Sequence, residues 1–207
     1  MRATPRKKAA IAAPVRTRTR LDLGERRAQL VALGLEKFSR QTYDEVSIDD
    51  VAREAGISKG LLYHYFPNKR DFYVACIREA SALLLAATDT DPSLPPLERS
   101  ALGLDAYLRY VEEHERAYVA LMRGGIGFDD EVSRICEESR ELILVRMLQG
   151  VDGHTVSPMV HHVLRGWIGF AEATAIDWIT TKKVPREEVR EMLADTLFHL
   201  VMRYGPG

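Results

Sequence analysis

The sequence has few cysteines, few aromatic residues and no long apolar run. Only two cysteines, Cys76 and Cys136, occur among 207 residues. Neither has a partner nearby in sequence, so we predict neither a disulfide framework nor a zinc site. No apolar run approaches a membrane span, and the alanine-rich stretch 9–13 is too short for a signal peptide. We therefore expect a protein of the reduced cytoplasm with no membrane segment.

Signatures of catalysis and metal binding are also missing. There is no Gly-x-Ser-x-Gly elbow, and no glycine-rich loop follows a strand. His154, His161 and His162 invite a metal hypothesis, but adjacent histidines on a helix point about 100° apart. No Glu-x-x-His pair adds a carboxylate ligand. We expect no enzyme, no metal site and no cofactor.

What the sequence does contain is apolar residues at helical spacing. The apolar fraction of 46% and the charged fraction of 29% are those of a globular protein. No strand pattern and no fixed repeat interrupts the series of helical stripes. We predict an all-α fold of about nine helices.

The clearest local pattern runs from Ser47 to Phe66. Ser47 and Ser58 can each cap the first turn of a short helix, and Gly56 suits the left-handed backbone of the turn between the two helices. This is the pattern of a helix-turn-helix. The residues that close its small core share three- and four-residue spacing: Ile48, Val51, Ala52, Ile57, Leu62 and Phe66.

The opposite face of the second helix is left pointing outward. It carries Lys59, Gly60, Leu61, Tyr63 and His64. Lys59 and Tyr63 are one turn apart, so a cation and a phenol project together, and Lys69 follows at the next helix start. Such a unit can place its second helix in the DNA major groove. The alternative is a plain helical hairpin with solvated side chains.

Residues Ile57 to Lys69 resemble the TetR family of bacterial transcription regulators, which carries Ile-Ser-Lys-Gly-x-Leu-Tyr-x-Tyr-Phe-x-x-Lys at this place. The resemblance is specific over residues 25–80. It implies a three-helix DNA-binding domain, a larger helical ligand-binding and dimerisation domain, and a homodimer on double-stranded operator DNA. The residues to which it gives DNA-binding roles are Ser47, Lys59, Gly60, Tyr63, His64, Tyr65 and Lys69. Ser58 and Leu61, which lie in the same stretch, complete the predicted DNA-binding residues.

Two positions depart from the family pattern. Leu61 stands where Thr, Ser or Ala is frequent, and a leucine can only touch a thymine methyl group. Thr42 stands where a glycine usually ends the preceding helix, and a β-branched residue disfavours the left-handed conformation.

Charge is distributed unevenly along the chain. Residues 1–80 hold 16 Lys/Arg against 10 Asp/Glu, although the whole chain has a net charge of −1. The first 20 residues include seven Lys/Arg and no acid, which predicts a disordered basic arm. Such an arm either adds DNA contacts or is merely a solvated tail.

The remainder predicts a larger helical domain. A long helix after Asn68 leaves the helix-turn-helix and ends in the loop 89–96. The stripe from Leu97 to Met122 predicts one helix, either continuous or broken in two, and Gly124–Gly127 interrupts it. Two long helices follow after Ser157 and Pro185. Both carry more apolar surface than one face can bury, which suits a four-helix interface between two copies.

Candidate ligand and interface residues lie on these helices. The interface candidates form one stripe of the last helix: Val189, Met192, Leu193, Leu197, Leu200 and Val201. The candidates for an apolar effector pocket are bulky residues with a few polar handles: Tyr107, Tyr110, Tyr118, Met122, Met147, Trp167, Phe170 and Trp178. Any one of these eight can instead be an ordinary core residue.

Together these patterns predict a DNA-binding regulator with residues 1–20 as the arm, 21–67 as the DNA-binding domain and 68–207 as the effector and dimerisation domain. We expect a repressor that a small, mostly hydrophobic effector releases from its operator. The alternatives are an activator, or a helical ligand-binding protein or enzyme without DNA function.

Overall fold

The computed structural model describes residues 22–123, 129–149 and 158–205. Within them the chain forms nine helices and no strand, so the predicted all-α fold is confirmed. The helices are α1 (Leu23–Phe38), α2 (Ile48–Glu54), α3 (Lys59–Tyr65), α4 (Lys69–Ala87), α5 (Pro96–Glu113), α6 (Glu115–Arg123), α7 (Asp130–Gln149), α8 (Pro158–Thr181) and α9 (Arg186–Tyr204). None of them is both long and apolar enough to cross a membrane. The predicted arm 1–20 and the Gly124–Gly127 interruption lie outside the described residues.

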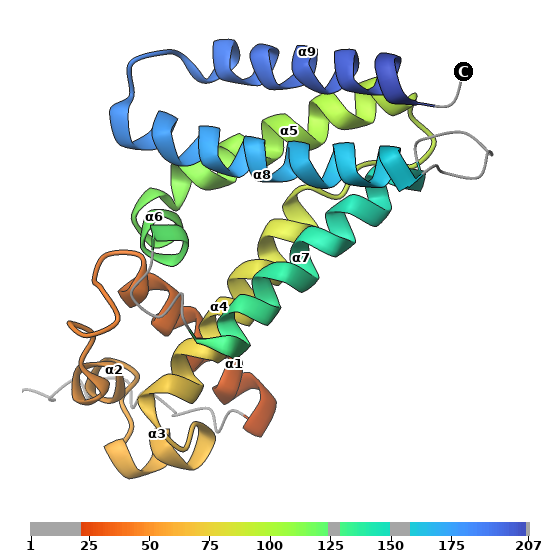
Figure 1. Ribbon diagram of the computed structural model, residues 1–207. Helices are drawn as coiled ribbons and strands as arrows, with labels where there is room; N and C mark the ends of the chain where they lie inside the picture. Colours follow the sequence, from red (N-terminus) through yellow and green to blue (C-terminus); the bar gives the residue numbers. More distant parts are fainter. Residues whose placement is uncertain (1–21, 124–128, 150–157, 206–207) are drawn as a thin grey trace, which may run out of the picture.

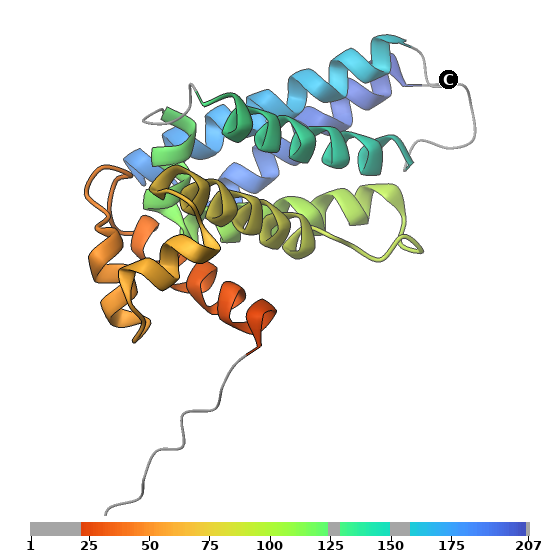
Figure 2. The same ribbon diagram turned by 90° about the horizontal axis from the view of Figure 1, so that it is seen from below.

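The helices gather at two ends of the molecule (Figure 1). Helices α1, α2 and α3 lie together at one end, and α5, α8 and α9 lie at the other. Helices α4 and α7 pack side by side and connect the two ends. Figure 2, seen from below, shows the same grouping of α1 to α3. The predicted long connector is therefore α4, with α7 beside it.

Side-chain caps fix the starts of the first four helices. Asp22 and Glu25 form a reciprocal capping box at α1. Ser47 accepts a hydrogen bond from the backbone N–H of Asp50, and Ser58 accepts one from Leu61. Asn68 caps α4. Each cap satisfies a backbone donor that the helix itself leaves free, and the caps predicted at Ser47 and Ser58 are present.

The end of α1 does not use a left-handed residue. Among the described residues, Lys182 is the one non-glycine with positive φ, so Thr42 keeps an ordinary backbone. The N–H of Thr42 donates to the carboxylate of Glu45 at 2.8 Å, and its carbonyl accepts from the N–H of Val46. Helix α1 ends at Phe38, with Ser39 as its C-cap, so its end needs no left-handed residue at position 42. Gly56 has φ 67°, which confirms the predicted left-handed turn between α2 and α3.

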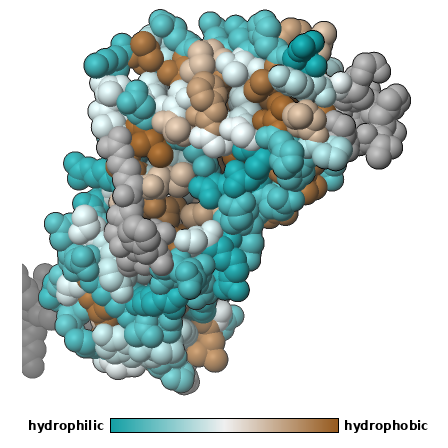
Figure 3. Space-filling view, viewed as in Figure 1, coloured by the Kyte–Doolittle hydropathy of each residue, from teal (hydrophilic) through white to brown (hydrophobic). Residues whose placement is uncertain are grey.

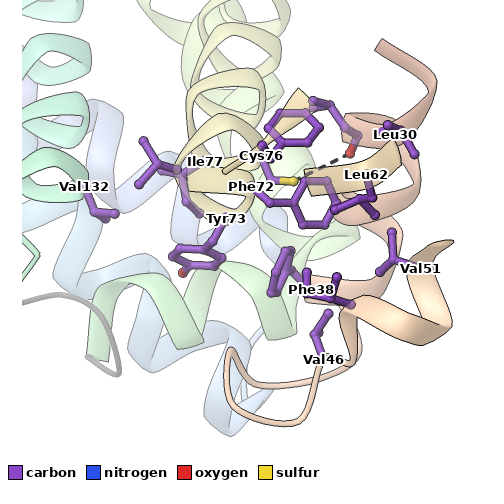
Figure 4. Packing of buried hydrophobic residues seen from close by; sticks show 14 of the residues in the cluster. Leu30, Phe38, Val46, Val51, Leu62, Phe72, Tyr73, Cys76, Ile77 and Val132 are labelled. Atoms are coloured by element: carbon purple, nitrogen blue, oxygen red, sulfur yellow. Dashed lines mark hydrogen bonds between the residues drawn. The ribbon is translucent and has the colours of Figure 1, made fainter. Parts of the chain in front are cut away.

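The first core lies under α1, α2 and α3 and is closed by α4 (Figure 4). Leu30, Val51, Leu62 and Phe72 are fully buried in it. The first turns of α7 contribute Val132, so this core also includes part of the second half of the chain. The packing of α1, α2 and α3 therefore depends on α4 and α7, which contribute residues to the same core.

Helices α1 and α4 approach each other closely at Gly34. A Cβ atom at this position would lie 2.5 Å from the Sγ atom of Cys76 and 2.5 Å from a ring carbon of Phe72, where no real Cβ fits. Cys76 also directs its thiol toward the carbonyl of Val31, with an S···O distance of 3.7 Å (Figure 4). The missing side chain at Gly34 therefore allows the contact between these two helices.

The second core lies among α5, α6, α7, α8 and α9. The predicted stripe from Leu97 to Met122 forms two helices, which meet at His114. The His114 ring stacks on Tyr110 with a centroid separation of 4.2 Å. A surface ion pair joins the starts of α4 and α7, because Arg70 at the start of α4 binds Asp129 just before α7, with Nη2–Oδ1 at 2.8 Å.

Candidate functional site

The outward face of α3 has the composition of an interaction surface. Lys59, Gly60, Leu61, Tyr63 and His64 are all exposed, whereas Leu62 between them is fully buried. The exposed fraction is 40% for Leu61 and 36% for Tyr63. Tyr65 and Phe66 turn back toward the first core. The helix is therefore anchored from one side and presents the other to solvent.

Gly60 has no packing role within the chain. A Cβ atom built there would meet no atom within 4 Å. The backbone conformation is that of an ordinary helix, and glycine in a helix is destabilising by about 0.5–1 kcal/mol relative to alanine. The absence of a side chain therefore gains nothing inside the protein. It does allow another molecule to come close to the backbone of α3.

The two cations near α3 are held in place by the protein. Lys59 Nζ lies 2.9 Å from Asp49 Oδ2 of α2, and this hydrogen bond with the charge of Asp49 raises the pKa of Lys59 above its ordinary value. Lys69 Nζ donates to the carbonyl of Asp44 at 3.1 Å and lies over the ring of Tyr43 at 4.7 Å. Both ammonium groups are thus held by hydrogen bonds within the protein.

The predicted DNA-contact residues come together at one end of the molecule. Ser47 begins α2, and Ser58 begins α3. Lys59, Gly60, Leu61, Tyr63, His64 and Tyr65 lie on α3, and Lys69 begins α4. Sequence reasoning did not single out Asp49 as the partner of Lys59, although its place in the first turn of α2 was visible. These two residues are ten positions apart and lie on different helices. Whether they can pair depends on the angle at which the helices cross, which the sequence pattern does not give.

A cavity of about 510 Å³ lies inside the second half of the chain and reaches toward the first core. Helices α4 to α9 contribute lining residues, and Leu35 and Phe38 of α1 also line it. Its lining is mainly apolar, and its volume is within the usual range for small-molecule sites. A molecule held there would touch helices from both ends of the protein.

Four polar side chains meet within this apolar lining. The hydroxyls of Tyr107 and Tyr118 lie 2.6 Å apart, and Arg140 Nε donates to Glu172 Oε1 at 2.9 Å. Burial raises the pKa of Tyr107 and of Tyr118, so both phenols stay neutral. Burial alone would lower the pKa of Arg140, but the hydrogen bonds and charge of Glu172 outweigh it and raise that pKa. The arrangement offers neutral hydroxyls beside a compensated ion pair.

Most of the predicted effector residues line the cavity, and two do not. Phe170 is 43% exposed on the outer face of α8. Trp178 is buried elsewhere in the second core, where its Nε1–H donates to the carbonyl of Val184 at 3.0 Å. The prediction that these two residues line the cavity therefore has to be corrected. Side chains of one helix point in several directions, so only some of them can face the cavity. The residues that do line it are Tyr107, Tyr110, Tyr118, Met122, Met147 and Trp167.

Sequence reasoning missed the charged lining of the cavity. Arg99, Arg140, Arg146 and Glu172 all line it. Each of these four residues lies in a helix whose charged residues mostly point to solvent. The sequence pattern therefore does not mark the four as facing the interior. Only the packing of helices far apart in sequence brings them together.

The predicted interface stripe on α9 also requires correction. Val189, Leu193 and Leu197 are 4%, 0% and 8% exposed and belong to the second core. They face α5 and α8 of their own chain, because the most apolar stripe of an amphipathic helix packs first against its own domain. Met192 remains exposed, and Leu200 and Val201 are partly buried.

Another face of α8 is exposed instead. Met159 is 54% exposed, and Gly166, Phe170 and Ala173 follow it at helical spacing on the same exposed side. A Cβ atom on Gly166 would meet nothing within 4 Å. Figure 3 shows apolar patches on the part of the surface where α8 and α9 lie. This face carries apolar and small side chains that the described part of the chain does not cover.

Metal binding and thiol chemistry have no support in the described part of the chain. No group of three or more potential metal ligands is found there, His161 and His162 are both exposed, and His154 lies outside the described residues. Burial raises the pKa of Cys76 to about 12 and also raises that of Cys136. Protonated thiols are poor nucleophiles.

The fold and the two sites define a class of protein. It is an all-helical protein in which a helix-turn-helix with an open reading face shares a core with the first helix of a cavity-bearing domain. Sequence comparison agrees. The profile described as "Bacterial regulatory proteins, tetR family" matches residues 30–76, and the one described as "Tetracyclin repressor-like, C-terminal domain" matches residues 96–200. The chain belongs to the TetR family.

Known proteins of this family resemble the chain to different extents. A TetR-family transcriptional regulator from Streptomyces coelicolor of known crystal structure is 34% identical, with a TM-score of 0.82 over 89% of this chain and 83% of that one. The transcriptional regulator AcuR of Cereibacter sphaeroides is 38% identical over 41% of this chain and 38% of its own length. The transcriptional activator FasR of Mycolicibacterium smegmatis is 29% identical over 48% of this chain and 46% of its own length. The chain thus spans less than half the length of these two curated relatives.

Proposed function

We propose that this chain is a DNA-binding transcriptional regulator that acts as a cytoplasmic homodimer. In this proposal residues 21–67 form the reading head, residues 68–207 form the effector and dimerisation domain, and residues 1–20 form a basic arm. The observation that supports it most is the exposed face of α3 around Gly60. Packing inside the protein does not require a glycine at this position. Lys59 and Tyr63 flank it in a position to meet phosphates and base edges.

Binding of labelled duplex DNA at several salt concentrations tests this function. The operator would first be located by genome-wide mapping of bound DNA. The binding constant should then fall linearly with salt concentration on a double logarithmic plot, because lysines release counterions from phosphates. If no salt-dependent duplex binding is found, the alternative function, a helical ligand-binding protein without DNA function, is favoured.

Lysine 69 provides a sharper test of how phosphate contacts contribute. Its ammonium group lies at the start of α4, where it can contact a phosphate but no base edge. We expect Lys69→Ala to weaken binding of operator and unrelated duplexes by the same factor and to reduce the salt slope by about one. Arg109→Ala is a suitable control, because Arg109 is exposed on α5 and pairs with Asp105. A loss confined to the operator would contradict this role.

We further propose that the regulator is a repressor and that a small, mostly hydrophobic effector in the cavity releases it from DNA. Support comes from the lining, which includes Leu35 and Phe38 of α1 as well as Cys76 and Ile77 of α4. These residues also belong to or pack against the core under the reading head. An effector that moves them changes the position of α3, and two reading heads must stay about 34 Å apart, or a multiple of this, to bind together.

Thermodynamic reciprocity tests the release mechanism. An effector that prefers the DNA-incompetent state must bind more weakly when operator is present, and by the factor by which it weakens operator binding. Calorimetric titration of the effector with and without saturating operator measures this factor. Equal affinities would rule out coupling through the cavity. An affinity that rises with operator would favour the activator role, which the name of FasR also suggests.

We propose that the homodimer forms through the exposed faces of α8 and α9. The face around Gly166 and Phe170 of α8 and Met192 of α9 is apolar or small and uncovered by the described chain. Small residues permit two helices to approach closely, and flanking apolar residues then bury surface from both subunits. Leu200 and Val201 are partly buried on α9, whereas Val189, Leu193 and Leu197 lie in the second core.

A further inference from the structure

The charged groups that line the cavity do not balance. Among the described residues, the lining includes three arginines and two carboxylates. A buried charge requires a partner, because moving it out of water is costly. The pairing of these five groups therefore shows which charge is left for a ligand. They are Arg99, Arg140, Arg146, Asp89 and Glu172.

Two of the arginines are already engaged. Arg140 binds both oxygens of Glu172 through Nε, and its Nη1 donates to Glu137. Arg146 donates through Nη1 to the carbonyl of Leu85 at 2.7 Å and lies 3.7 Å from Asp89. Both carboxylates of the lining are thereby used.

Arg99 is the cation without a carboxylate. No ion pair of Arg99 within 4.0 Å is found in residues 22–123, 129–149 and 158–205, and its Nε is buried without a hydrogen-bond partner there. Asp91 is near enough for Arg99 to contribute to its lowered pKa, but the hydrogen bonds from Ser93 are the larger cause, and Asp91 itself is exposed. Arg99 thus lines the cavity with a buried Nε that no hydrogen-bond acceptor in the described residues reaches.

The position of Arg99 favours an anion for a second reason. It lies in the first turns of α5, next to Pro95, which precedes the helix without any side-chain cap. The positive end of a helix dipole favours negative charge, and the only acid of this turn, Glu98, is exposed to solvent. The rest of the cavity beyond this end is predominantly apolar.

We infer that the effector is an amphipathic carboxylate, whose anionic head binds Arg99 where α4 ends and α5 begins and whose apolar body lies among α5, α7, α8 and α9. This inference rests on the proposed role of the cavity as the effector site. A planar guanidinium matches the two oxygens of a carboxylate, and such charge-assisted hydrogen bonds are stronger than neutral ones. A neutral ligand of the same shape would leave Arg99 unpaired.

Calorimetric titration of the full chain with decanoate and with 1-decanol tests the inference. The two probes share an apolar chain and differ in the head group. We expect decanoate to bind at least about tenfold more tightly than decanol. Arg99→Met keeps an apolar side chain of similar length, and it should remove this preference while changing decanol binding by less than about twofold. Arg99→Lys should retain part of the preference, because the charge remains.

The matched control is Arg109→Met, which removes an exposed arginine of the same helix that does not line the cavity. It should change neither affinity. Equal binding of the two probes to the native protein, an equal loss for both in Arg99→Met, or no binding of decanoate would each overturn the inference. Because these titrations contain no DNA, they are independent of the regulatory proposal. Decanoate that binds through Arg99 but leaves operator affinity unchanged would contradict only the release mechanism.

Discussion

Replacement of Gly60 by arginine is expected to abolish specific operator binding, with a loss of at least about a hundredfold. The protein should still fold, because a Cβ atom at this position meets nothing within 4 Å and the residue is exposed in an ordinary helix. The new side chain would stand between α3 and the base edges. Electrophoretic or anisotropy measurement of operator binding, with far-UV circular dichroism for helix content, checks both expectations.

Ala86→Arg is the control for the added charge. Ala86 is an exposed small residue near the end of α4, far from α3 in the fold. Both variants gain one positive charge, so a loss of binding seen only in Gly60→Arg comes from the position of the new side chain on α3. If Gly60→Arg binds the operator as well as Ala86→Arg does, α3 is not the element that enters the groove. Tyr63→Ala should reproduce the loss, since its exposed ring lies one turn from Lys59.

A charge at Phe170 is expected to split the dimer. Phe170 is 43% exposed on α8, so Phe170→Glu should leave the fold of the subunit intact. In an apolar interface the carboxylate would be buried without a partner, which is costly. Monomers then bind one half-site each, and the operator affinity should fall by at least about a hundredfold, since linked binding is lost. Analytical ultracentrifugation measures the oligomeric state.

Leu142→Glu provides the comparison, because Leu142 is 50% exposed on α7 and does not line the cavity. It should remain dimeric. Leu197→Glu should behave differently from both and unfold the second core, in which Leu197 is buried. A dimer that survives Phe170→Glu would place the interface on another face.

The parts of the fold that could be predicted from sequence are those set by short-range interactions. Ser47 and Ser58 cap helices that begin one residue later, and Gly56 supplies the left-handed turn within the same stretch. Each of these depends on a few neighbouring backbone groups. The outward face of α3 followed from the same local periodicity.

The features that could not be predicted depend on which helices become neighbours. The stripe of Leu193 and Leu197 marks one apolar face of α9, but periodicity does not tell whether its own chain or a second copy covers that face. Arg99 and Arg146 similarly lie in different helices, and only the tertiary packing turns both toward one cavity. The Thr42 position shows a third case, because α1 already ends at Phe38 and the N–H of Thr42 bonds the carboxylate of Glu45 without a left-handed backbone.

The contact at Gly34 makes α4 a lever. Because α1 and α4 meet with no side chain between them, α1 cannot slide over α4 without a clash with Phe72 or Cys76. The 19 residues of α4 span about 28 Å, so a tilt of about 5° at the cavity end moves its start by about 2 Å. In the proposed dimer, such a tilt would change the distance between the two reading heads.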